Sequence, residues 1–376
     1  MTVATCLALC AIIENAVVPE LVGHHSGPAP SPSRRSPDDP RPGSPAGRLT
    51  KAVDRAVTKR LAAVARTVYG RNAPRPMVRV TRRDRHRDWA FGASVLPAPA
   101  RSGTVPEAAL FVAHRSGRTW SIGVGGTVRF RHLVERAPSA VLPADQRRAL
   151  TRYADGYLPG APSGSEGADT GLVLPWRLGH AWTFAGATAG TLAFSRGDGT
   201  VRAAGSGRLY RLCAHGLVMI VHRNGLATEY AQITDLPAIP DGGYVRQGAY
   251  LGHVGDAAPC RSAHAPARLG FALRNADSRL SVDGLRLGAW TLHARDDHAW
   301  ATCAGHRVDT GGRLPNETEP PSPSPGTSAS PVAKPHPSPS ATPATGKPSA
   351  AKPSGTPAGD PPAGNAPAHP TPGVLR

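Results

Sequence analysis

No apolar run in this 376-residue chain reaches the roughly 18 residues that a helix needs to cross a bilayer, which excludes a bundle of membrane-spanning helices. Glycine (42) and proline (40) are abundant, but they follow no Gly-X-Y period, which excludes a collagen-like chain. Both residue types are unevenly placed, so the chain is not one uniformly disordered segment. Its length allows two domains of ordinary size with an appendage.

Lysine is scarce, and this affects the interpretation of the charge. The Lys and Arg residues (44) exceed the Asp and Glu residues (26), for a formal net charge of +18. Lysine occurs only at Lys51, Lys59, Lys334, Lys347 and Lys352. Nearly all of the positive charge is therefore arginine, as is typical of a GC-rich genome, and a solvated basic surface is the simplest interpretation. The alternative is attraction to an anionic wall polymer, a membrane surface or nucleic acid, although we expect no specific nucleic-acid partner.

Four segments have compositions unlike the rest of the chain. Residues 1–23 contain a short apolar run, "TVATCLALCAII", that lacks the usual positive flank and predicts a weak signal-like segment. Residues 24–47 and 156–171 are rich in Pro, Gly and Ser and predict linkers. Residues 315–376 contain almost no large apolar side chains. Burial of apolar surface therefore cannot offset the conformational entropy that folding would cost, and the composition predicts a disordered tail.

Residues 48–155 predict a small α+β module. Apolar residues recur at helical spacing over 48–69 and predict an amphipathic helix. The segments 77–96, 109–124 and 128–134 alternate apolar with polar or basic residues and predict a small antiparallel sheet, and residues 143–153 predict a closing helix. The module contains no cluster of potential ligands or nucleophiles, so the sequence assigns it no role.

Residues 172–314 predict a mainly β domain of stacked antiparallel sheets, because short apolar segments alternate with turns. Arg223-Asn224-Gly225 separates two apolar strands and predicts a tight hairpin, since glycine can adopt the positive φ that the turn needs. The segment "RLGFAL" at 268–273 predicts one further strand.

Several phrases of this domain occur in a specific order. They are Leu174-Pro175-Trp176, "FSRGDG" (194–199), "VMIVHRNGLATEYAQI" (218–233), "GYVRQGAYLG" (243–252), "RLGFAL" (268–273) and "DGLRLGAWTLHA" (283–294). In this order they resemble the LytM/lysostaphin class of peptidoglycan endopeptidases, peptidase family M-23, and within it the staphylolysin-like branch. The resemblance implies a β-sheet groove that admits a peptide cross-link, with a zinc ion held by three protein ligands at its floor.

Each position that the resemblance assigns to this site carries a different residue here. The metal-ligand positions fall at Thr188, Ala193 and Gly270, and the catalytic histidine positions fall at Gln232 and Arg268. Alanine and glycine offer no donor atom, a neutral threonine hydroxyl is a poor zinc ligand, and a guanidinium cannot coordinate a cation. Losing all three ligands removes a binding free energy on the order of 10 kcal/mol. We therefore expect no zinc at these positions and no other cofactor.

Five further histidines of the domain leave a relocated zinc site open. They are His180, His215, His222, His253 and His264. No pair of them shows a metal-ligand signature such as His-Glu-x-x-His. Structural or surface roles are therefore the default interpretation of these histidines.

Two cysteines survive in this domain although the site positions do not. Cys213 and Cys260 fall where the staphylolysin-like branch carries a disulfide, so the resemblance implies a bridge, and two free thiols are the alternative. A bridge would close a loop of about 47 residues and argue for an oxidising, extracytoplasmic compartment. Cys303 has no evident partner.

These observations favour a non-catalytic relative of the M-23 peptidases in the cell envelope. It would bind peptidoglycan peptides or a partner wall hydrolase, with Arg268 suited to an acidic peptide carboxylate. Two alternatives from other classes stay open: an active zinc endopeptidase with a relocated ligand set, and an arginine-rich binder of an anionic wall polymer. A sequence with no selected activity is a further alternative.

Overall fold

The computed structural model describes residues 44–69, 74–99, 105–155, 170–188, 190–261, 263–295 and 298–317. All of these described residues belong to one compact unit. Several predicted segments lie outside the described residues. They are the signal-like segment 1–23, most of the linkers 24–47 and 156–171, and the tail from residue 318 on. Of the two linkers, only residues 44–47 and 170–171 are described. None of the described helices is long and apolar enough to cross a membrane.

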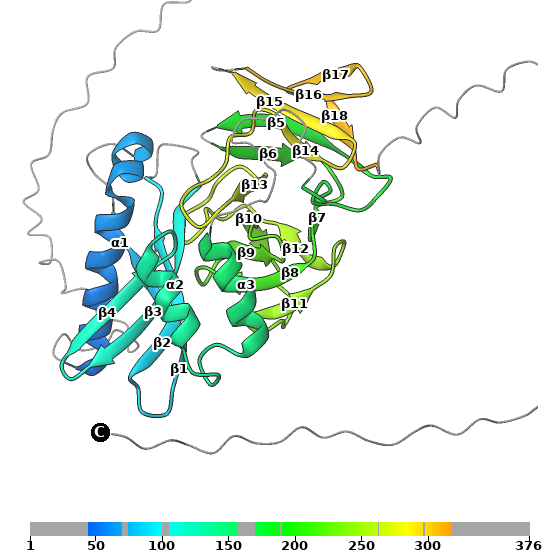
Figure 1. The fold of residues 1–376 in the computed structure, drawn as a ribbon. Coiled ribbons are helices and arrows are strands. Elements are labelled where there is room, and N and C mark those ends of the chain that lie inside the picture. Colours follow the sequence, from blue (N-terminus) through cyan, green and yellow to red (C-terminus); the bar gives the residue numbers. More distant parts are fainter. Residues whose placement is uncertain are drawn as a thin grey trace, which may run out of the picture. The chain divides into compact units, whose positions relative to one another are not determined.

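The N-terminal module, residues 44–155, combines three helices with one antiparallel sheet in the order β1-β2-β3-β4 (Figure 1). Its elements are α1 (Pro45–Tyr69), β1 (Met77–Arg83), β2 (Trp89–Leu96), β3 (Glu107–Ser116), β4 (Thr119–Val124), α2 (Val128–Arg136) and α3 (Ala144–Asp155). Helix α1 begins earlier than the predicted residue 48, because the Ser44 hydroxyl accepts a hydrogen bond from the Gly47 backbone N–H and caps the helix there.

The prediction of a strand over residues 128–134 is wrong, because these residues form helix α2. The side chain of Thr127 accepts a hydrogen bond from the Phe130 backbone N–H and caps the helix. Phe130, Leu133 and Val134 are buried at i, i+3 and i+4. The apolar residues of this segment fit both short-range alternation and helical spacing. The threonine before them is a common helix cap, and it was the sequence signal that indicated a helix.

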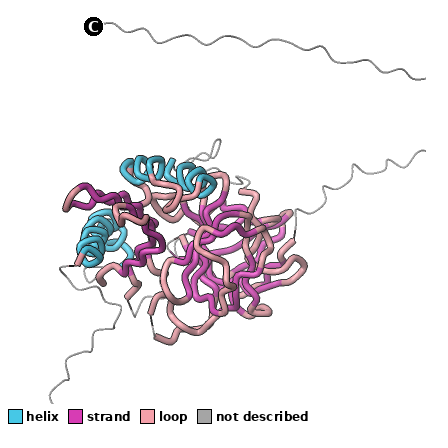
Figure 2. The backbone as a smooth tube through the Cα atoms, turned by 90° about the horizontal axis from the view of Figure 1, so that it is seen from below, coloured by secondary structure: helices cyan, strands magenta, loops and turns pink. Residues whose placement is uncertain are grey.

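The β domain, residues 170–317, contains strands and loops, and Figure 2 shows the helices gathered in the N-terminal module. Its strands are β5 (Ala181–Thr188), β6 (Thr191–Ser195), β7 (Thr200–Arg202), β8 (Gly207–Arg211), β9 (Gly216–His222), β10 (Ala227–Thr234), β11 (Gly243–Val245), β12 (Tyr250–Val254), β13 (Leu269–Arg274), β14 (Leu285–Leu287), β15 (Trp290–Arg295), β16 (His298–Cys303), β17 (His306–Asp309) and β18 (Arg313–Pro315). The predicted hairpin joins β9 to β10, and Gly225 has φ +89°. The predicted fold class, a mainly β domain of antiparallel sheets with a small α+β module, is confirmed.

Two sheets make up the β domain. The larger has ten strands, with the main order β11-β8-β9-β10-β13-β6-β5-β18 and with β12 pairing β10 and β7. The smaller has the order β14-β15-β16-β17. The domain extends beyond the predicted boundary at 314, because Pro315 belongs to β18 and Asn316 is buried, with its Nδ2 donating to the Leu174 carbonyl at 2.9 Å.

The ten-stranded sheet is covered on both faces. We call the face that packs against β14–β16 the inner face; it carries aromatic and aliphatic side chains such as Phe184, Phe194 and Phe271. The opposite face, which we call the outer face, packs with Leu217, Met219 and Val221 of β9 against the N-terminal module. The larger part of the sheet is therefore enclosed between two layers of the same chain.

Strands β2 and β3 of the N-terminal module are buried on both of their faces. One set of side chains, including Ala90 and Phe111, packs against α1. The alternate set, including Phe91 and Leu110, packs against α2, α3 and the outer face of the ten-stranded sheet. Burial on both faces explains why these two strands are almost continuously apolar, whereas a strand with one solvated face alternates.

Candidate functional site

Two of the positions that the resemblance assigns to zinc ligands are direct neighbours on the outer face. Gly270 on β13 pairs with Ala193 on β6 and, on its other side, with Ala231 on β10. Leu192, Phe194 and Phe271 belong to the inner-face core. Because side chains alternate along a strand, Ala193 and Gly270 face the N-terminal module's side of the sheet.

A residue of the N-terminal module lies directly over Gly270. A Cβ atom added at Gly270 would lie 3.1 Å from Val105 Cγ2 and 3.1 Å from Ala231 Cβ. These distances are tighter than ordinary van der Waals contact, so any larger side chain at position 270 would displace a neighbour. The space that a ligand side chain would need at this position is occupied by Val105.

The segment around Val105 is fixed to its surroundings at four consecutive residues. The Tyr69 hydroxyl donates to the Val105 carbonyl at 3.0 Å, and Arg279 Nη2 donates to the Pro106 carbonyl at 2.6 Å. Arg279 Nη1 also pairs with the Glu107 carboxylate at 2.6 Å. Arg274 Nη1 donates to the Ala108 carbonyl at 2.7 Å. Two arginines of the β domain therefore hold this segment on the outer face.

The two arginines share a second carboxylate, Glu229 of β10. Arg274 pairs with Glu229 Oε1, and Arg279 Nε pairs with Glu229 Oε2 at 2.9 Å. All three side chains are buried, as is Glu107. Burial raises the pKa of Glu229, but the guanidinium groups of Arg274 and Arg279 outweigh burial and hold that pKa below its usual range. We call these four side chains the buried ion network; it joins the two parts of the chain.

Sequence reasoning missed the buried ion network, although a signal was present. Glu107 precedes the apolar run of β3, Glu229 interrupts β10, and Arg274 ends the apolar strand β13. A charged residue within an otherwise buried strand needs a partner of opposite charge. The sequence could therefore indicate that partners exist, but not that they lie on different modules.

The three remaining positions assigned by the resemblance have different environments. Gln232 lies in a β-bulge of β10 with φ +63°, and its Nε2 donates to the Pro266 carbonyl at 3.0 Å. Arg268 is exposed immediately before β13. Thr188 is exposed at the end of β5, where it pairs with Thr191, while Gly186 pairs with Ala193. Ala193 and Gly270 are thus brought together, Gln232 is tethered to the segment that leads to Arg268, and Thr188 lies at the hairpin end.

The M-23 resemblance implies a zinc ion, and the residues at these positions do not fit one. Ala193 and Gly270 have no donor atom, and Thr188 offers one neutral hydroxyl. At Gly270 the neighbouring volume is filled by Val105. Among the residues that the structure describes, no group of three or more His, Cys, Asp or Glu side chains could hold a metal ion.

Four of the five further histidines of the β domain each have partners of their own in the structure. His222 is buried, with Nδ1 at 2.9 Å from the Ser206 carbonyl and Nε2 at 2.9 Å from the Thr228 hydroxyl. Burial lowers the pKa of His222, and the hydrogen bond to Ser206 opposes this shift. His180, His253 and His264 each lie near a single aspartate, at 3.6, 3.8 and 3.6 Å. His222 is therefore a structural residue of the inner face.

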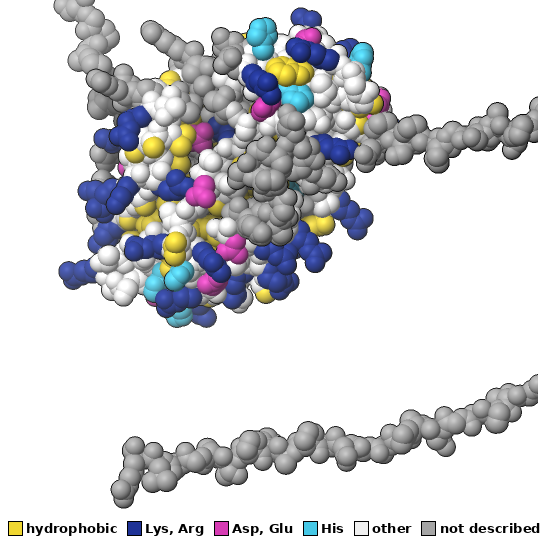
Figure 3. Space-filling model, turned by 45° about the horizontal axis from the view of Figure 1, so that its top comes forward, with side chains coloured by type: hydrophobic (Ala, Val, Ile, Leu, Met, Phe, Trp, Pro, Cys, Tyr) yellow, Lys and Arg dark blue, Asp and Glu magenta, His cyan; other side chains and the backbone are white. Residues whose placement is uncertain are grey.

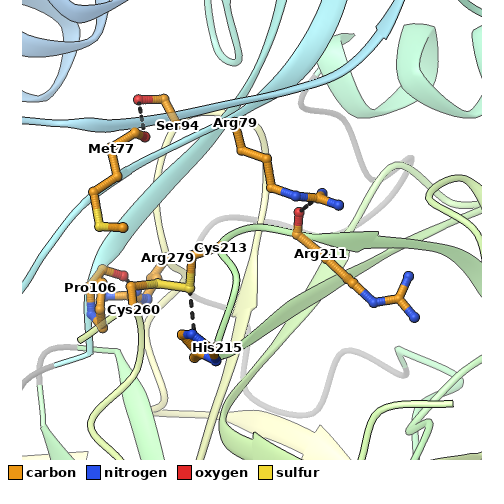
Figure 4. The surroundings of a disulfide bond; sticks show 9 residues. All are labelled: Met77, Arg79, Ser94, Pro106, Arg211, Cys213, His215, Cys260 and Arg279. Atoms are coloured by element: carbon orange, nitrogen blue, oxygen red, sulfur yellow. Dashed lines mark hydrogen bonds between the residues drawn. A yellow bond between two sulfur atoms is a disulfide. The ribbon is translucent and has the colours of Figure 1, made fainter. Parts of the chain in front are cut away.

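Cys213 and Cys260 form a disulfide in the structure. Both lie in the core shared by the two parts of the chain. Figure 4 shows residues of both parts around the bridge: Met77, Ser94 and Pro106 from the N-terminal module, and His215 and Arg279 from the β domain. The Cys260 backbone N–H donates to the His215 carbonyl at 2.9 Å. The bridge thus ties the loop before β9 to the loop before β13.

A pocket of about 540 Å³ opens beside Gln232. It is lined by the end of β10, from Gln232 to Thr234, by Asp235 and Leu236 after that strand, and by the loops that flank the disulfide, including His215 and Arg261. The Arg211 guanidinium lines it while donating to the Pro237 carbonyl at 2.6 Å and to the Ile239 carbonyl. The exposed carboxylate of Asp235 supplies the opposite charge. The pocket therefore offers positive side chains such as Arg211 and the negative side chain of Asp235 next to the backbone at the end of β10.

Similarity to known proteins is limited to solved structures. No protein-family profile and no curated protein matches the chain. A solved structure described as a novel M-23 metalloprotease, pseudoalterin, from the deep sea is similar at 20% identity and a TM-score of 0.36. The match covers 39% of this chain and 98% of that structure. At this identity the likeness says nothing about activity.

Proposed function

We propose that this chain is a non-catalytic relative of the M-23 endopeptidases that binds peptides of the cell envelope. Its β domain would retain the architecture of the family while its ligand positions hold no zinc. The order of the sequence motifs from Leu174 to Ala294 supports the kinship. The replaced ligand positions and the side chain of Val105 over Gly270 support the loss of catalysis.

The observation that carries the binding role is the pocket beside Gln232, which we call the peptide pocket. The pocket's volume suits a few residues of peptide rather than a large ligand. Peptidoglycan peptides carry carboxylates and amines, and the pocket offers Arg211, Arg261 and Asp235 as complementary charges. The exposed Arg268 is a further candidate for a peptide carboxylate. A partner wall hydrolase could present the same kind of peptide.

The disulfide supports a place outside the cytoplasm. Disulfides persist in oxidising compartments and are rare where thiols are kept reduced. Cys213–Cys260 lies between loops that also line the peptide pocket, so the bridge would fix the pocket's shape in the compartment where peptidoglycan is found. We therefore propose an extracytoplasmic location.

The binding role is tested by titrating peptidoglycan-derived peptides into the full chain and measuring the heat of binding. Thr234 is exposed on β10 and lines the pocket, so Thr234→Trp should fill the pocket and abolish the signal. Thr119→Trp, at an exposed position of β4 outside the pocket, should bind like the wild type. Equal binding by the wild type and by Thr234→Trp would remove the pocket from the proposal.

The non-catalytic role is tested separately by metal analysis of the purified chain and by incubation with wall suspensions. We expect no stoichiometric zinc and no release of peptide, with or without a chelator. One zinc per chain together with chelator-sensitive clearing would show an active endopeptidase with a relocated ligand set. That outcome would overturn the loss of catalysis, whatever the binding experiment gives.

A further inference from the structure

A second pocket, of about 380 Å³, lies where α3 of the N-terminal module meets the β domain. Its wall on the α3 side includes Asp145, Arg148 and Arg152, which share one side of the helix at i, i+3 and i+7. Its wall on the β-domain side includes Arg208 and Arg223. We call it the arginine pocket. Because its arginines come from both parts of the chain, the pocket exists only when the two parts are docked.

Basic side chains are spread over the face drawn in Figure 3, with fewer acidic ones between them, so a surface arginine is not by itself a site. The arginine pocket differs because its arginines are arranged around a concavity. Arg208 pairs with Asp145, donates to the Gly242 carbonyl at 3.2 Å, and lies 5.4 Å from the centre of the Tyr244 ring. The Arg208 side chain is 23% exposed, so it is a partly buried member of the arginines that line the pocket.

The other three arginines, Arg148, Arg152 and Arg223, add positive charge to the pocket and form no ion pair in the described structure. Arg152 Nη1 donates to the Arg223 carbonyl at 3.3 Å, which holds helix α3 against the turn after β9. Within the described parts of the chain, none of Arg148, Arg152 and Arg223 has a carboxylate within ion-pair distance. Four guanidinium groups thus surround the pocket against one carboxylate, Asp145. Gathering like charges costs free energy, which a bound anion would recover.

We propose that the arginine pocket binds a phosphate-bearing ligand with two or more negative charges. A single carboxylate would leave most of this charge uncompensated, whereas a phosphate group can accept hydrogen bonds from several guanidinium groups at once. The Tyr244 ring, 57% exposed at the pocket's edge, offers an apolar surface for the organic part of the ligand. The ligand is either a small phosphate compound or a stretch of at least two phosphodiester units of a wall polymer. This site is independent of the peptide pocket.

The test is a titration of the full chain with inorganic pyrophosphate and, separately, with a glycerol phosphate polymer, followed by calorimetry at several salt concentrations. The variant Arg148→Gln/Arg223→Gln removes two exposed charges that make no ion pair in the described structure. Arg118→Gln/Arg129→Gln removes the same charge from two exposed positions outside the pocket, on the β3–β4 turn and on α2. Thermal unfolding of both variants should match the wild type, so that a change in binding reports the pocket.

We expect the pocket variant to bind pyrophosphate at least about tenfold more weakly, on the scale of charge-assisted hydrogen bonds, and the control variant to bind within about twofold of the wild type. Binding should weaken as salt rises. Tighter binding of the polymer than of pyrophosphate, per phosphate, identifies a polymeric source, and the reverse identifies a small one.

Three results would overturn the proposal. The first is equal weakening in both variants, which would show a general effect of net charge. The second is citrate binding as tightly as pyrophosphate and with the same dependence on Arg148 and Arg223, which would show that the pocket does not select phosphate. The third is a single-stranded oligonucleotide binding more tightly than both pyrophosphate and the glycerol phosphate polymer, which would assign the pocket to nucleic acid and not to a small phosphate compound or a wall polymer.

Discussion

The two faces of the ten-stranded sheet bury polar groups in different ways, and three consecutive residues of β10 show the difference. Thr228 and Tyr230 point to the inner face, where the Thr228 hydroxyl donates to the Tyr230 hydroxyl at 3.0 Å and also contacts His222. Glu229, between them, points to the outer face and joins the buried ion network. The inner network is neutral and lies within the β domain, whereas the outer network is ionised and is completed by the N-terminal module.

This difference shows how the layer packed on each face of the sheet satisfies the buried polar groups of that face. The inner face needs only its own domain, because Tyr230 also accepts a hydrogen bond from the Ala204 backbone N–H at 2.8 Å. On the outer face, Arg274 and Arg279 share one carboxylate of their own domain, and Glu107 of the N-terminal module supplies the second. Without that module, Arg279 would lose one of its two carboxylates, and the apolar outer face would be exposed to water. The N-terminal module is therefore a structural part of the β domain rather than a separate appendage.

The largest expected effect comes from breaking the outer network. Glu229→Gln leaves Arg274 and Arg279 with one carboxylate between them and should lower the free energy of unfolding by about 3–5 kcal/mol, as measured in urea. Glu135→Gln breaks an exposed pair with Arg131 on α2 and should cost less than about 1 kcal/mol. Similar losses in the two variants would mean that the buried network contributes no more than a surface ion pair.

A smaller effect tests the contact over Gly270, a position that the M-23 resemblance assigns to a zinc ligand. Gly270→His should lower the free energy of unfolding by about 1–3 kcal/mol, because its side chain overpacks against Val105 and Ala231. The same substitution in a Val105→Ala background should cost less, so a double-mutant cycle should give a coupling energy. Additive costs would show that Val105 does not occupy the space beside position 270.

The smallest expected effect concerns pH and the inner face. The pKa of His222 is lowered by burial, so the unfolded chain binds a proton at His222 at a higher pH than the folded chain does. Stability from the neutral imidazole is fully present above the unfolded pKa of about 6.5 and is lost as pH falls below it, by at most about 1.4 kcal/mol per pH unit.

Urea unfolding between pH 6.5 and pH 5 checks this expectation. The loss of stability on acidification should be smaller in His222→Gln than in the wild type, because the substituted side chain does not titrate. The exposed His306→Gln serves as the control and should follow the wild type. Identical slopes in all three proteins would contradict a buried, neutral His222. The window lies above the range in which Glu229 titrates, because its pKa is held below its usual value.

Local features of the fold were predictable where one short stretch of sequence decides them. The hairpin at Gly225 and the helix over residues 144–155 follow from turn chemistry and helical spacing. The segment 128–134 was mispredicted because its apolar residues fit alternation as well as helical spacing, and the Thr127 cap resolves the ambiguity. For the candidate site, the motifs located Ala193 and Gly270, which the sheet register places side by side.

The sequence by itself determined which residues stand at the positions that the resemblance assigns to zinc ligands, because residue identity alone decides whether a donor atom exists. It also determined the positions of the two cysteines that form the bridge. Only the tertiary structure decided that Val105 lies on Gly270, that Glu107 pairs with Arg279, and that arginines of α3, of β8 and of the turn after β9 surround one pocket. These contacts join residues more than fifty positions apart. No local pattern encodes such pairings, because they depend on how two sheets pack face to face.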